Sequence, residues 1–365
     1  MKKVFSMLLC LLLLCSCSAT KKDDIDAASA YAKEYQGFSY YRDQLNEKEQ
    51  TIYDTIYYHL SKHDQSFGVE ADDKDTLFDL YEYVLADHPE IFWEDGSNVS
   101  YTTSSIGDKT VFEVYASNTF SLKEIQHYEK QLDEVTKGIL AKVAQLDHDY
   151  EKVKYIYDYV IDHTTYQENS MYNQTILSVF LYQSSVCAGY AKSIQYLLNK
   201  ADIPCTYLWG GTTYSQEDHA WNLVKMDGDI YYLDATNGDQ DDEQLDERWR
   251  YSFFSMTSSQ MLALYHPDID YMESTALKDN YFYRNDAYLD TSNLQDIQRL
   301  LSKEAHNDHP TLIFQCETNK VCDTLNETLQ DGNTLFDLAQ KEGIIAQSYQ
   351  SYHQKETNTW MYQLK

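Results

Sequence analysis

The sequence is poor in proline and glycine, with 4 and 12 of these residues in a chain of 365. No stretch rich in glycine and serine separates one part of the chain from another. This excludes separate domains joined by flexible linkers and predicts domains that pack directly against each other. The length is enough for about two or three domains with a substantial core.

Basic residues are also scarce, because 29 lysines and arginines face 59 acidic residues and give a formal net charge of −30. Without a basic patch the chain cannot displace the counterions of a nucleic acid, so nucleic acid is excluded as a partner. We interpret the acidity as a means of keeping the protein soluble.

The 34 tyrosines either stack on sugars or peptides or fill core and half-buried positions, and composition does not decide between the two.

Long apolar runs are absent except near the N-terminus, where two lysines precede an apolar run from Val4 to Leu14. This pattern predicts a secretory signal, because about 11 apolar residues are too few to span a bilayer. The letters L-C-S-C that end at Cys17 resemble the cleavage box of bacterial lipoproteins. We therefore expect residues 1–16 to be a lipoprotein signal peptide and Cys17 to be lipidated. Plain secretion, with cleavage after Ala19, is the alternative.

The expected localisation follows from this leader. The protein would be extracytoplasmic and anchored to the cell membrane by the lipid on Cys17, with the polar, acidic residues 17–30 as a tether. No later apolar segment is long enough to span a bilayer, so we expect everything after the tether to lie outside the membrane.

Cysteine is too rare for a disulfide framework once the leader is set aside. Four cysteines remain. Cys205 lies in an apolar run and reads as a buried strand residue. Cys316 and Cys322 are close enough in sequence to pair, although spacing alone does not show that they do. Cys187 remains to be explained.

Three regions follow the tether. Residues 31–146 alternate helical patterns with a strand-like run and predict an α/β accessory module. Residues 147–275 begin with a strongly amphipathic helix, continue to the helix of Cys187 and then give three strand-like runs. Residues 276–365 predict a second α/β module, with strands expected at YFYR (281–284), TLIFQC (311–316) and WMYQL (360–364).

Cys187 stands at the front of an amphipathic helix, SSVCAGYAKSIQYLL. It shares one helical face with Ala191, Ile194 and Leu198, at spacings of four, three and four. The thiol is thus expected on the buried face but in the first turn, where unpaired N–H groups favour a thiolate. Gly189, in the same turn, leaves room for another group to approach.

A second pattern, HAWNLVKMDGDIYYLDAT, predicts a hairpin. Asp-Gly at 227–228 between two apolar-rich runs is a strong turn signal, and centring the turn there pairs residues whose numbers sum to 455. His219 and Asp234 then point to the same side of the sheet, diagonally about 7–8 Å apart. Cysteine chemistry needs such a pair, because the thiol requires a base and the base requires a group that orients it.

These stretches together resemble the transglutaminase-like superfamily, in its bacterial, papain-like branch. The motifs that carry the resemblance are C-x-G-Y-A, H-A-W-N and Y-x-x-D-x-T, which occur in the order typical of the family over about 120 residues. The resemblance implies an α+β fold in which the cysteine helix packs on an antiparallel sheet. It also implies that Cys187 is the nucleophile, that His219 is the general base and acid, and that Asp234 orients His219.

The resemblance assigns supporting roles as well. Trp221 and Asn222 would support the site together with Gly189, and Tyr190 would pack beneath it. Helix N–H groups near Cys187 would stabilise the oxyanion. Gln183 is a candidate for the side-chain donor by position, although an ordinary surface glutamine is the alternative.

The family chemistry passes through a Cys thioester. Animal cross-linking enzymes carry G-Q-C-W around the nucleophile, whereas this chain has S-V-C-A, which favours hydrolysis of peptide or amide bonds over cross-linking. Surface proteins or cell-wall peptides are the expected substrates. The alternative is a surface binding or scaffold protein that holds peptides in an inactive core.

We expect no cofactor and no metal, since the acidic stretch 237–247 lacks the geometry of an EF-hand and the other histidines lack ligand spacing.

Overall fold

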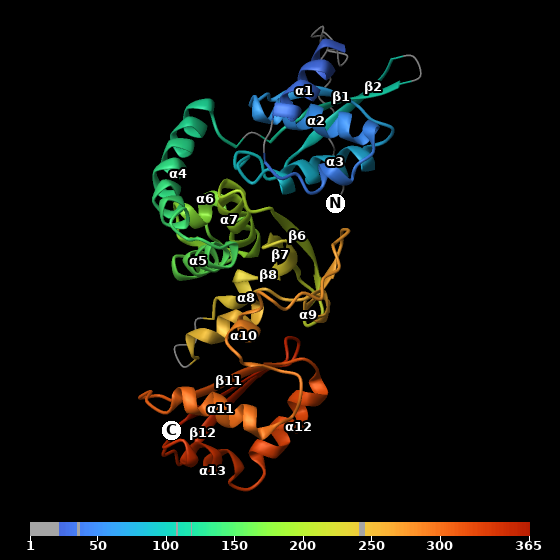
Figure 1. Cartoon of the computed structure of the whole chain (residues 1–365). Helices are drawn as coiled ribbons and strands as arrows, with labels where there is room; N and C mark the ends of the chain where they lie inside the picture. The colour runs from blue at the N-terminus through green and yellow to red at the C-terminus, as the bar shows by residue number, and fades with distance from the viewer. Residues whose placement is uncertain (1–21, 35–36, 107–108, 118, 241–244) are drawn as a thin grey trace, which may run out of the picture. The chain divides into compact units, whose positions relative to one another are not determined.

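A computed structural model of the chain describes residues 22–34, 37–106, 109–117, 119–240 and 245–365 (Figure 1). The predicted signal peptide and Cys17 therefore lie outside the described residues. The chain forms two compact units, one from Met1–Tyr35, Leu45–Val84 and Gly96–Asn118, the other from Gln36–Gln44, Leu85–Asp95 and Thr119–Lys365. Among the described helices, none has both the length and the apolar character needed to cross a membrane.

The first unit is a three-stranded antiparallel sheet with helices, in the strand order β1-β3-β2. Its elements are α1 (Lys22–Glu34), α2 (Glu47–Ser61), β1 (Ser66–Glu70), α3 (Lys74–Asp87) up to Val84, β2 (Ser100–Ile106) and β3 (Lys109–Tyr115). It stops before α4 (Leu122–Val143), which belongs to the second unit. The division by contacts thus differs from the boundary at 146 that the sequence suggested.

The expected tether differs from the structure too, because α1 begins at Lys22. Ala28 is buried, and the ring of Tyr31 lies 5.6 Å from those of Tyr57 and Tyr58 on α2. The spacing of Ala28 and Tyr31 puts both on one face of α1, and burial of that face against α2 holds the helix in place.

The core of the second unit is an antiparallel sheet in the order β8-β7-β6-β9, with α7 packed on β6 and β7 (Figure 1). Its elements are η1 (Arg42–Gln44), α4, α5 (Asp149–Asp162), β4 (Thr165–Tyr166), α6 (Ile176–Phe180), β5 (Ser184–Ser185), α7 (Cys187–Lys200), β6 (Cys205–Thr212), β7 (Asp218–Met226), β8 (Asp229–Leu233), α8 (Ala235–Gly238), η2 (Glu247–Phe253), α9 (Ser258–Leu264) and β9 (Tyr265–Pro267). The predicted helix on an antiparallel sheet is confirmed.

The hairpin of β7 and β8 has the predicted register. Asn222 pairs with Leu233, and Met226 pairs with Asp229, so that paired numbers sum to 455. Asp227 and Gly228 form the turn with φ values of 50° and 94°, as a type I′ turn requires. The ladder ends at Asn222 and Leu233, one pair before Asp234 would face Trp221.

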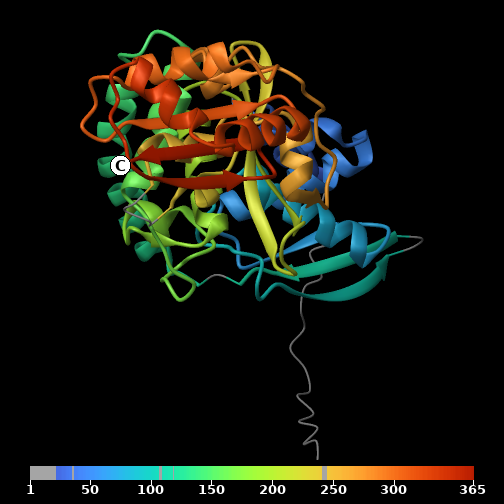
Figure 2. The same ribbon diagram turned by 90° about the horizontal axis from the view of Figure 1, so that it is seen from below.

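The C-terminal residues build a four-stranded sheet in the order β10-β11-β13-β12, whose red strands run side by side in Figure 2. Its elements are α10 (Tyr281–Arg284), β10 (Tyr288–Leu289), α11 (Leu294–Glu304), β11 (Thr311–Cys316), α12 (Asn319–Gln330), α13 (Thr334–Lys341), β12 (Tyr349–Gln354) and β13 (Thr359–Leu364). Two predicted strands are confirmed as β11 and β13. The prediction for 281–284 was wrong, because Asn280 caps a helical turn there by accepting from the N–H of Tyr283 at 3.1 Å.

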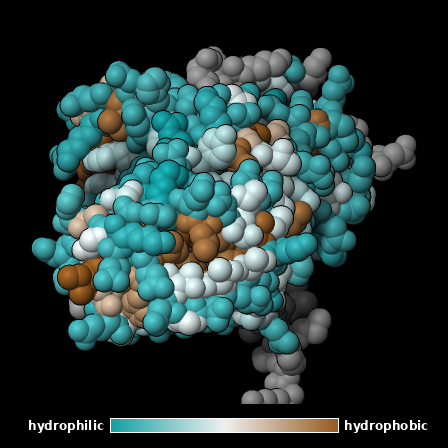
Figure 3. Space-filling model, turned by 60° about the horizontal axis from the view of Figure 1, so that its bottom comes forward, coloured by the Kyte–Doolittle hydropathy of each residue, from teal (hydrophilic) through white to brown (hydrophobic). Residues whose placement is uncertain are grey.

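The face of the molecule drawn in Figure 3 is largely hydrophilic, with apolar side chains in several smaller areas. This agrees with the formal net charge of −30 and with the apolar residues lying mainly in the core.

Close approach of β9 to β6 depends on Gly210. The two strands are antiparallel, with Gly210 opposite Pro267 and Thr212 opposite Tyr265. A Cβ atom on Gly210 would lie 2.1 Å from the carbonyl oxygen of His266, which is closer than unbonded atoms can approach. Glycine at this position therefore lets β9 lie against β6.

We predict that Gly210→Ala lowers the free energy of unfolding by about 3 kcal/mol, near the upper end of ordinary single substitutions. The matched control is Gly211→Ala, since a Cβ atom there meets no atom within 4 Å. Urea denaturation of both variants measures the difference. Equal stabilities of the two variants would show that β9 is not held by this contact.

Candidate active site

Cys187 is the first residue of α7 and is partly exposed. The N-cap residue is Val186, and no side chain caps the helix. The first N–H groups of α7 are thus left without a side-chain acceptor at the thiol's end of the helix. An uncapped N-terminus favours negative charge and provides donors for an anion.

His219 and Asp234 form a pair beside this helix, as the hairpin register predicts. The His219 Nε2 atom lies 2.9 Å from Asp234 Oδ2. The side chain of His219 is 10% exposed and that of Asp234 is fully buried. Asp234 follows β8 directly and is the N-cap of α8, where its Oδ1 atom accepts from the N–H of Asn237 at 3.0 Å.

The imidazole of His219 is shared between a carboxylate and the thiol. Burial disfavours the charged ring, but the charge and hydrogen bond of Asp234, together with those of Cys187, outweigh it and raise the pKa of His219 to about 10. Because Nε2 is engaged by Asp234, Nδ1 is the ring nitrogen left for the thiol. His219 is therefore an imidazolium at neutral pH, placed between two acceptors.

Two residues that the sequence did not reveal complete the surroundings of Asp234. The hydroxyl of Tyr265 donates to Asp234 Oδ2, and the side-chain amide of Asn237 donates to the same oxygen at 2.8 Å. Burial would raise the pKa of Asp234, but His219, Tyr265 and the N–H of Asn237 hold it below its usual value. The position of Asn237, three residues after an aspartate, is a signal typical of an N-cap, whereas Tyr265 carries no local signal.

Tyr265 also orients the histidine through its ring. It lies 5.2 Å from the ring of His219 and 4.4 Å from that of Trp221, nearly parallel to both, at 20° and 19°. Trp221 is fully buried. Tyr265 is thus stacked against the rings of both Trp221 and His219, and a supporting role of Trp221 in the chemistry stays a prediction.

The other expected supporting residues hold α7 in place. The Asn222 amide donates to the carbonyl oxygens of Ala191 at 2.9 Å and Thr206 at 3.2 Å, which joins α7 to β6. Tyr190 is fully buried, and its hydroxyl donates to Asp239 at 2.5 Å.

Gly189 serves packing rather than the approach of a substrate. A Cβ atom at this position would lie 1.9 Å from Ser185 Oγ and 2.5 Å from Ser178 Oγ. Gln183 is exposed, and no hydrogen bond joins its side chain to Cys187 or His219 in the described part of the chain. A role for Gln183 as a donor to the oxyanion stays a prediction.

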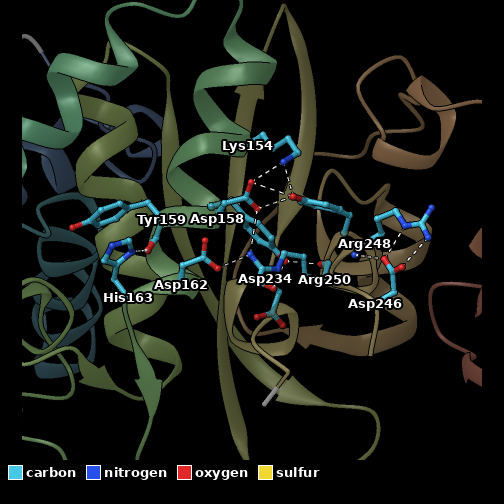
Figure 4. Close-up of polar contacts among 11 residues, drawn as sticks. Lys154, Asp158, Tyr159, Asp162, His163, Asp234, Asp246, Arg248 and Arg250 are labelled. Carbon is cyan, nitrogen blue, oxygen red and sulfur yellow. Dashed lines mark hydrogen bonds and ion pairs between the residues drawn. The ribbon is translucent and has the colours of Figure 1, made fainter. Parts of the chain in front are cut away.

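A network outside the site fixes the backbone of Asp234 (Figure 4). The hydroxyl of Tyr157 donates to the carbonyl oxygens of Asp234 at 3.1 Å and Arg250 at 2.9 Å. Arg250, on η2, forms an ion pair with Asp162 of α5 at 2.7 Å. These contacts join α5, η2 and the residue that follows β8.

Two exposed tyrosines flank the thiol. Tyr166 pairs with Ser185 across β4 and β5, two residues before Cys187, and is 45% exposed. Tyr214 is 53% exposed and accepts a hydrogen bond from the Asn237 amide at 3.1 Å. Burial raises the pKa of both hydroxyls, and the nearby charge of Cys187 adds to this. The partly exposed thiol thus has two exposed tyrosines in its surroundings.

The remaining cysteines are not part of this arrangement. Cys316 and Cys322 form a disulfide with a Cα–Cα distance of 5.6 Å. Cys205 is fully buried, and burial raises the pKa of its thiol well above the usual value. Within the described ranges, no three His, Cys, Asp or Glu side chains are arranged to hold a metal ion.

The raised pKa of His219 predicts a pH dependence of stability. Its contribution is complete below about pH 6.5, the unfolded value, and is lost as the pH rises towards 10. Urea denaturation between pH 5 and 10 should therefore show that wild type loses its advantage over His219→Gln with rising pH. His266→Gln, on an exposed residue of β9, is the control. A difference that does not change with pH would mean that His219 is neutral in the folded protein.

Removal of the Tyr265 hydroxyl should act on Asp234. In Tyr265→Phe the ring stack remains, but a buried carboxylate loses one donor, at a cost of about 1–3 kcal/mol. The stability due to Asp234 is present above its unfolded pKa and lost as the pH falls through the folded one. Tyr265→Phe raises the pKa of Asp234 in the folded protein. As the pH falls, the variant should therefore begin to lose stability at a higher pH than wild type.

The control for this variant is Tyr362→Phe, which removes a buried hydroxyl that donates to the neutral Asn326 amide at 2.6 Å. Urea denaturation between pH 3 and 7 measures both variants. Parallel acid profiles of Tyr265→Phe and wild type would exclude a role for the hydroxyl in keeping Asp234 charged.

Comparison with known proteins gives one family and several structures. Residues 137–235 match the sequence model of the Transglutaminase-like superfamily. A crystal structure of a TGase matches with a TM-score of 0.30 and 14% identity over 40% of this chain and 46% of that chain. A candidate cysteine protease from Cytophaga hutchinsonii matches with a TM-score of 0.26 and 17% identity, over 38% of this chain and 62% of that one.

A candidate protease from Parabacteroides distasonis matches with a TM-score of 0.24 and 16% identity, over 38% of this chain and 36% of that chain. The chain thus spans less than half the length of the TGase. The comparison with curated proteins finds no match. The matched segment contains Cys187, His219 and Asp234, and residues 137–235 form a transglutaminase-like core within an α+β protein.

Proposed function

We propose that this protein is a thiol enzyme that acts on peptide or carboxamide bonds through a thioester on Cys187. The observation that carries the proposal is the arrangement of His219, with Nε2 held by the buried Asp234 and the thiol on its other side. The partly exposed Cys187 stands at the uncapped end of α7. A nucleophile, a base and an orienting group are thereby in place.

Acylation would begin from a thiolate that faces the His219 imidazolium. The sulfur attacks the carbonyl carbon, and the electron pair of the C=O bond moves to oxygen, where the first N–H groups of α7 donate to it. When this intermediate collapses, the C–N bond breaks. The nitrogen leaves as ammonia or an amine and takes its proton from His219.

Deacylation would reverse the role of His219. The neutral imidazole takes a proton from water or from an amine, which attacks the thioester carbonyl. The C–S bond breaks, and the thiolate again faces an imidazolium. Water gives hydrolysis and an amine gives acyl transfer. The S-V-C-A sequence around Cys187 favours hydrolysis over protein cross-linking in our proposal.

The proposed substrates are surface proteins or cell-wall peptides. Tyr166 and Tyr214 flank the thiol with exposed rings, which suit an extended chain better than a small closed ligand. The proposed location outside the cytoplasm rests on the signal pattern of residues 1–16 and on the cleavage-box pattern that ends at Cys17. The disulfide between Cys316 and Cys322 is of a kind that persists in such compartments.

The first experiment measures the alkylation rate of each cysteine in the full-length chain in detergent. Iodoacetamide at pH 6 should modify Cys187 at least tenfold faster than Cys205, because Cys187 is partly exposed beside the His219 ring whereas Cys205 is fully buried. His219→Ala should remove this advantage and His266→Ala should not. Mass spectrometry reports each site separately.

The second part of the test incubates the enzyme with carboxamide-containing peptides, with and without methylamine. Product masses then separate hydrolysis from transfer, and an adduct on Cys187 identifies the acyl-enzyme. If Cys187 is as slow as Cys205, the enzyme proposal fails, and the alternative of a surface protein that holds peptides without turning them over is favoured.

A further inference from the structure

A polar pocket of about 410 Å³ lies between the core and the C-terminal sheet, within the size range of small-ligand sites. The C-terminal residues supply more than half of its wall, so the pocket exists only because the two parts are joined. It is lined by Thr257, Ser259, Gln260 and Ala263 from the core, and by Tyr288, Glu317, Asn319, Lys355, Glu356 and Asn358.

Buried polar contacts hold the two sides of the pocket together. Asn280 of the core donates to Gln315 of β11 at 3.0 Å, and Gln315 donates to Thr359 of β13 at 3.2 Å. Gln260 donates to the carbonyl oxygen of Thr357 at 3.4 Å. Each of these side chains is less than 10% exposed. A satisfied buried network of this kind fixes relative position, so the wall is preformed.

One wall of the pocket is joined along the chain to the residues around Asp234. Its core wall is α9, which runs directly into Tyr265. The Thr213 hydroxyl donates to the carbonyl oxygen of Ala263 at 2.8 Å, and the next residue is Tyr214. Burial raises the pKa of Tyr214, and the charges of Asp234, Cys187 and Glu356 all add to this. The contact of Thr213 with Ala263 thus joins the pocket wall to the segment that carries Tyr214.

The pocket carries one ammonium and two carboxylates, those of Lys355, Glu317 and Glu356. Lys355 and Glu317 are exposed, and within the described ranges neither side chain takes part in an ion pair. Glu356 accepts from the neutral side-chain amide of Gln354 at 2.8 Å. An ammonium and a carboxylate in one preformed pocket recognise a ligand that carries both complementary charges.

We propose that this pocket binds the C-terminal end of a peptide whose last residue carries an ammonium group, with the carboxylate on Lys355 and the ammonium on Glu317. As a recognition subsite for the Cys187 reaction it rests on the proposed function. Binding itself does not, because no atom of the thiol is needed. The C-terminal part of the chain would then select substrates for the core.

The test uses the full-length Cys187→Ala chain in detergent and three probes in ligand-detected NMR titrations. N-acetyl-lysine has both charges, its primary amide lacks the carboxylate, and N-acetyl-norleucine lacks the ammonium. N-acetyl-lysine should bind about three- to fivefold more tightly than either analogue, the gain expected of one solvent-accessible charge pair. Lys355→Ala should abolish the preference over the amide, and Glu317→Gln the preference over norleucine.

Lys341→Ala and Asp337→Asn are the matched controls, because both residues are exposed on α13 and outside the pocket lining. They should leave all three affinities unchanged. Equal affinities for the three probes, or an equal loss in the control variants, would overturn the proposal. Selective binding together with slow alkylation of Cys187 would refute the proposed enzyme activity and support the proposed pocket. Fast alkylation of Cys187 without selective binding would support the activity and refute the pocket.

Discussion

Burial of the Asp234 carboxylate is the constraint on which the rest of the site depends. The side chain has no exposed surface, and an unpaired carboxylate in such a place would cost several kcal/mol. Four donors satisfy it: the His219 ring, the backbone and side-chain amides of Asn237, and the Tyr265 hydroxyl. They come from β7, α8 and β9, so this charge is stable only when three separate elements are assembled around it.

The same requirement explains features at some distance from the carboxylate. Tyr265 reaches Asp234 because β9 lies close to β6, and this approach needs a residue without a side chain at Gly210. The carbonyl group of Asp234 is held by Tyr157, whose hydroxyl also holds Arg250. A contact between α5 and η2 thus determines where the orienting group of the site lies.

The parts of the site that follow local rules could be predicted from the sequence, and those set by chain topology could not. A turn at 227–228 fixes a register, and the register places His219 beside Asp234, so arithmetic along one hairpin was sufficient. Tyr265 enters through a strand that returns 31 residues after Asp234, and no periodicity indicates that. Gly189 was recognised as unusual, but only the structure shows Ser185 and Ser178 against it. YFYR was too short for its pattern to separate strand from helix.

The excess of donors around Asp234 has a consequence for the thiol. A carboxylate with several donors stays ionised, and an ionised Asp234 keeps the His219 ring charged although burial opposes that charge. The charged His219 ring that faces Cys187 is therefore stabilised by residues that do not contact the sulfur atom. Cys187 itself remains partly exposed at the end of α7. The protein thus combines a buried charge network with a partly exposed thiol, which is the nucleophile in the proposed function.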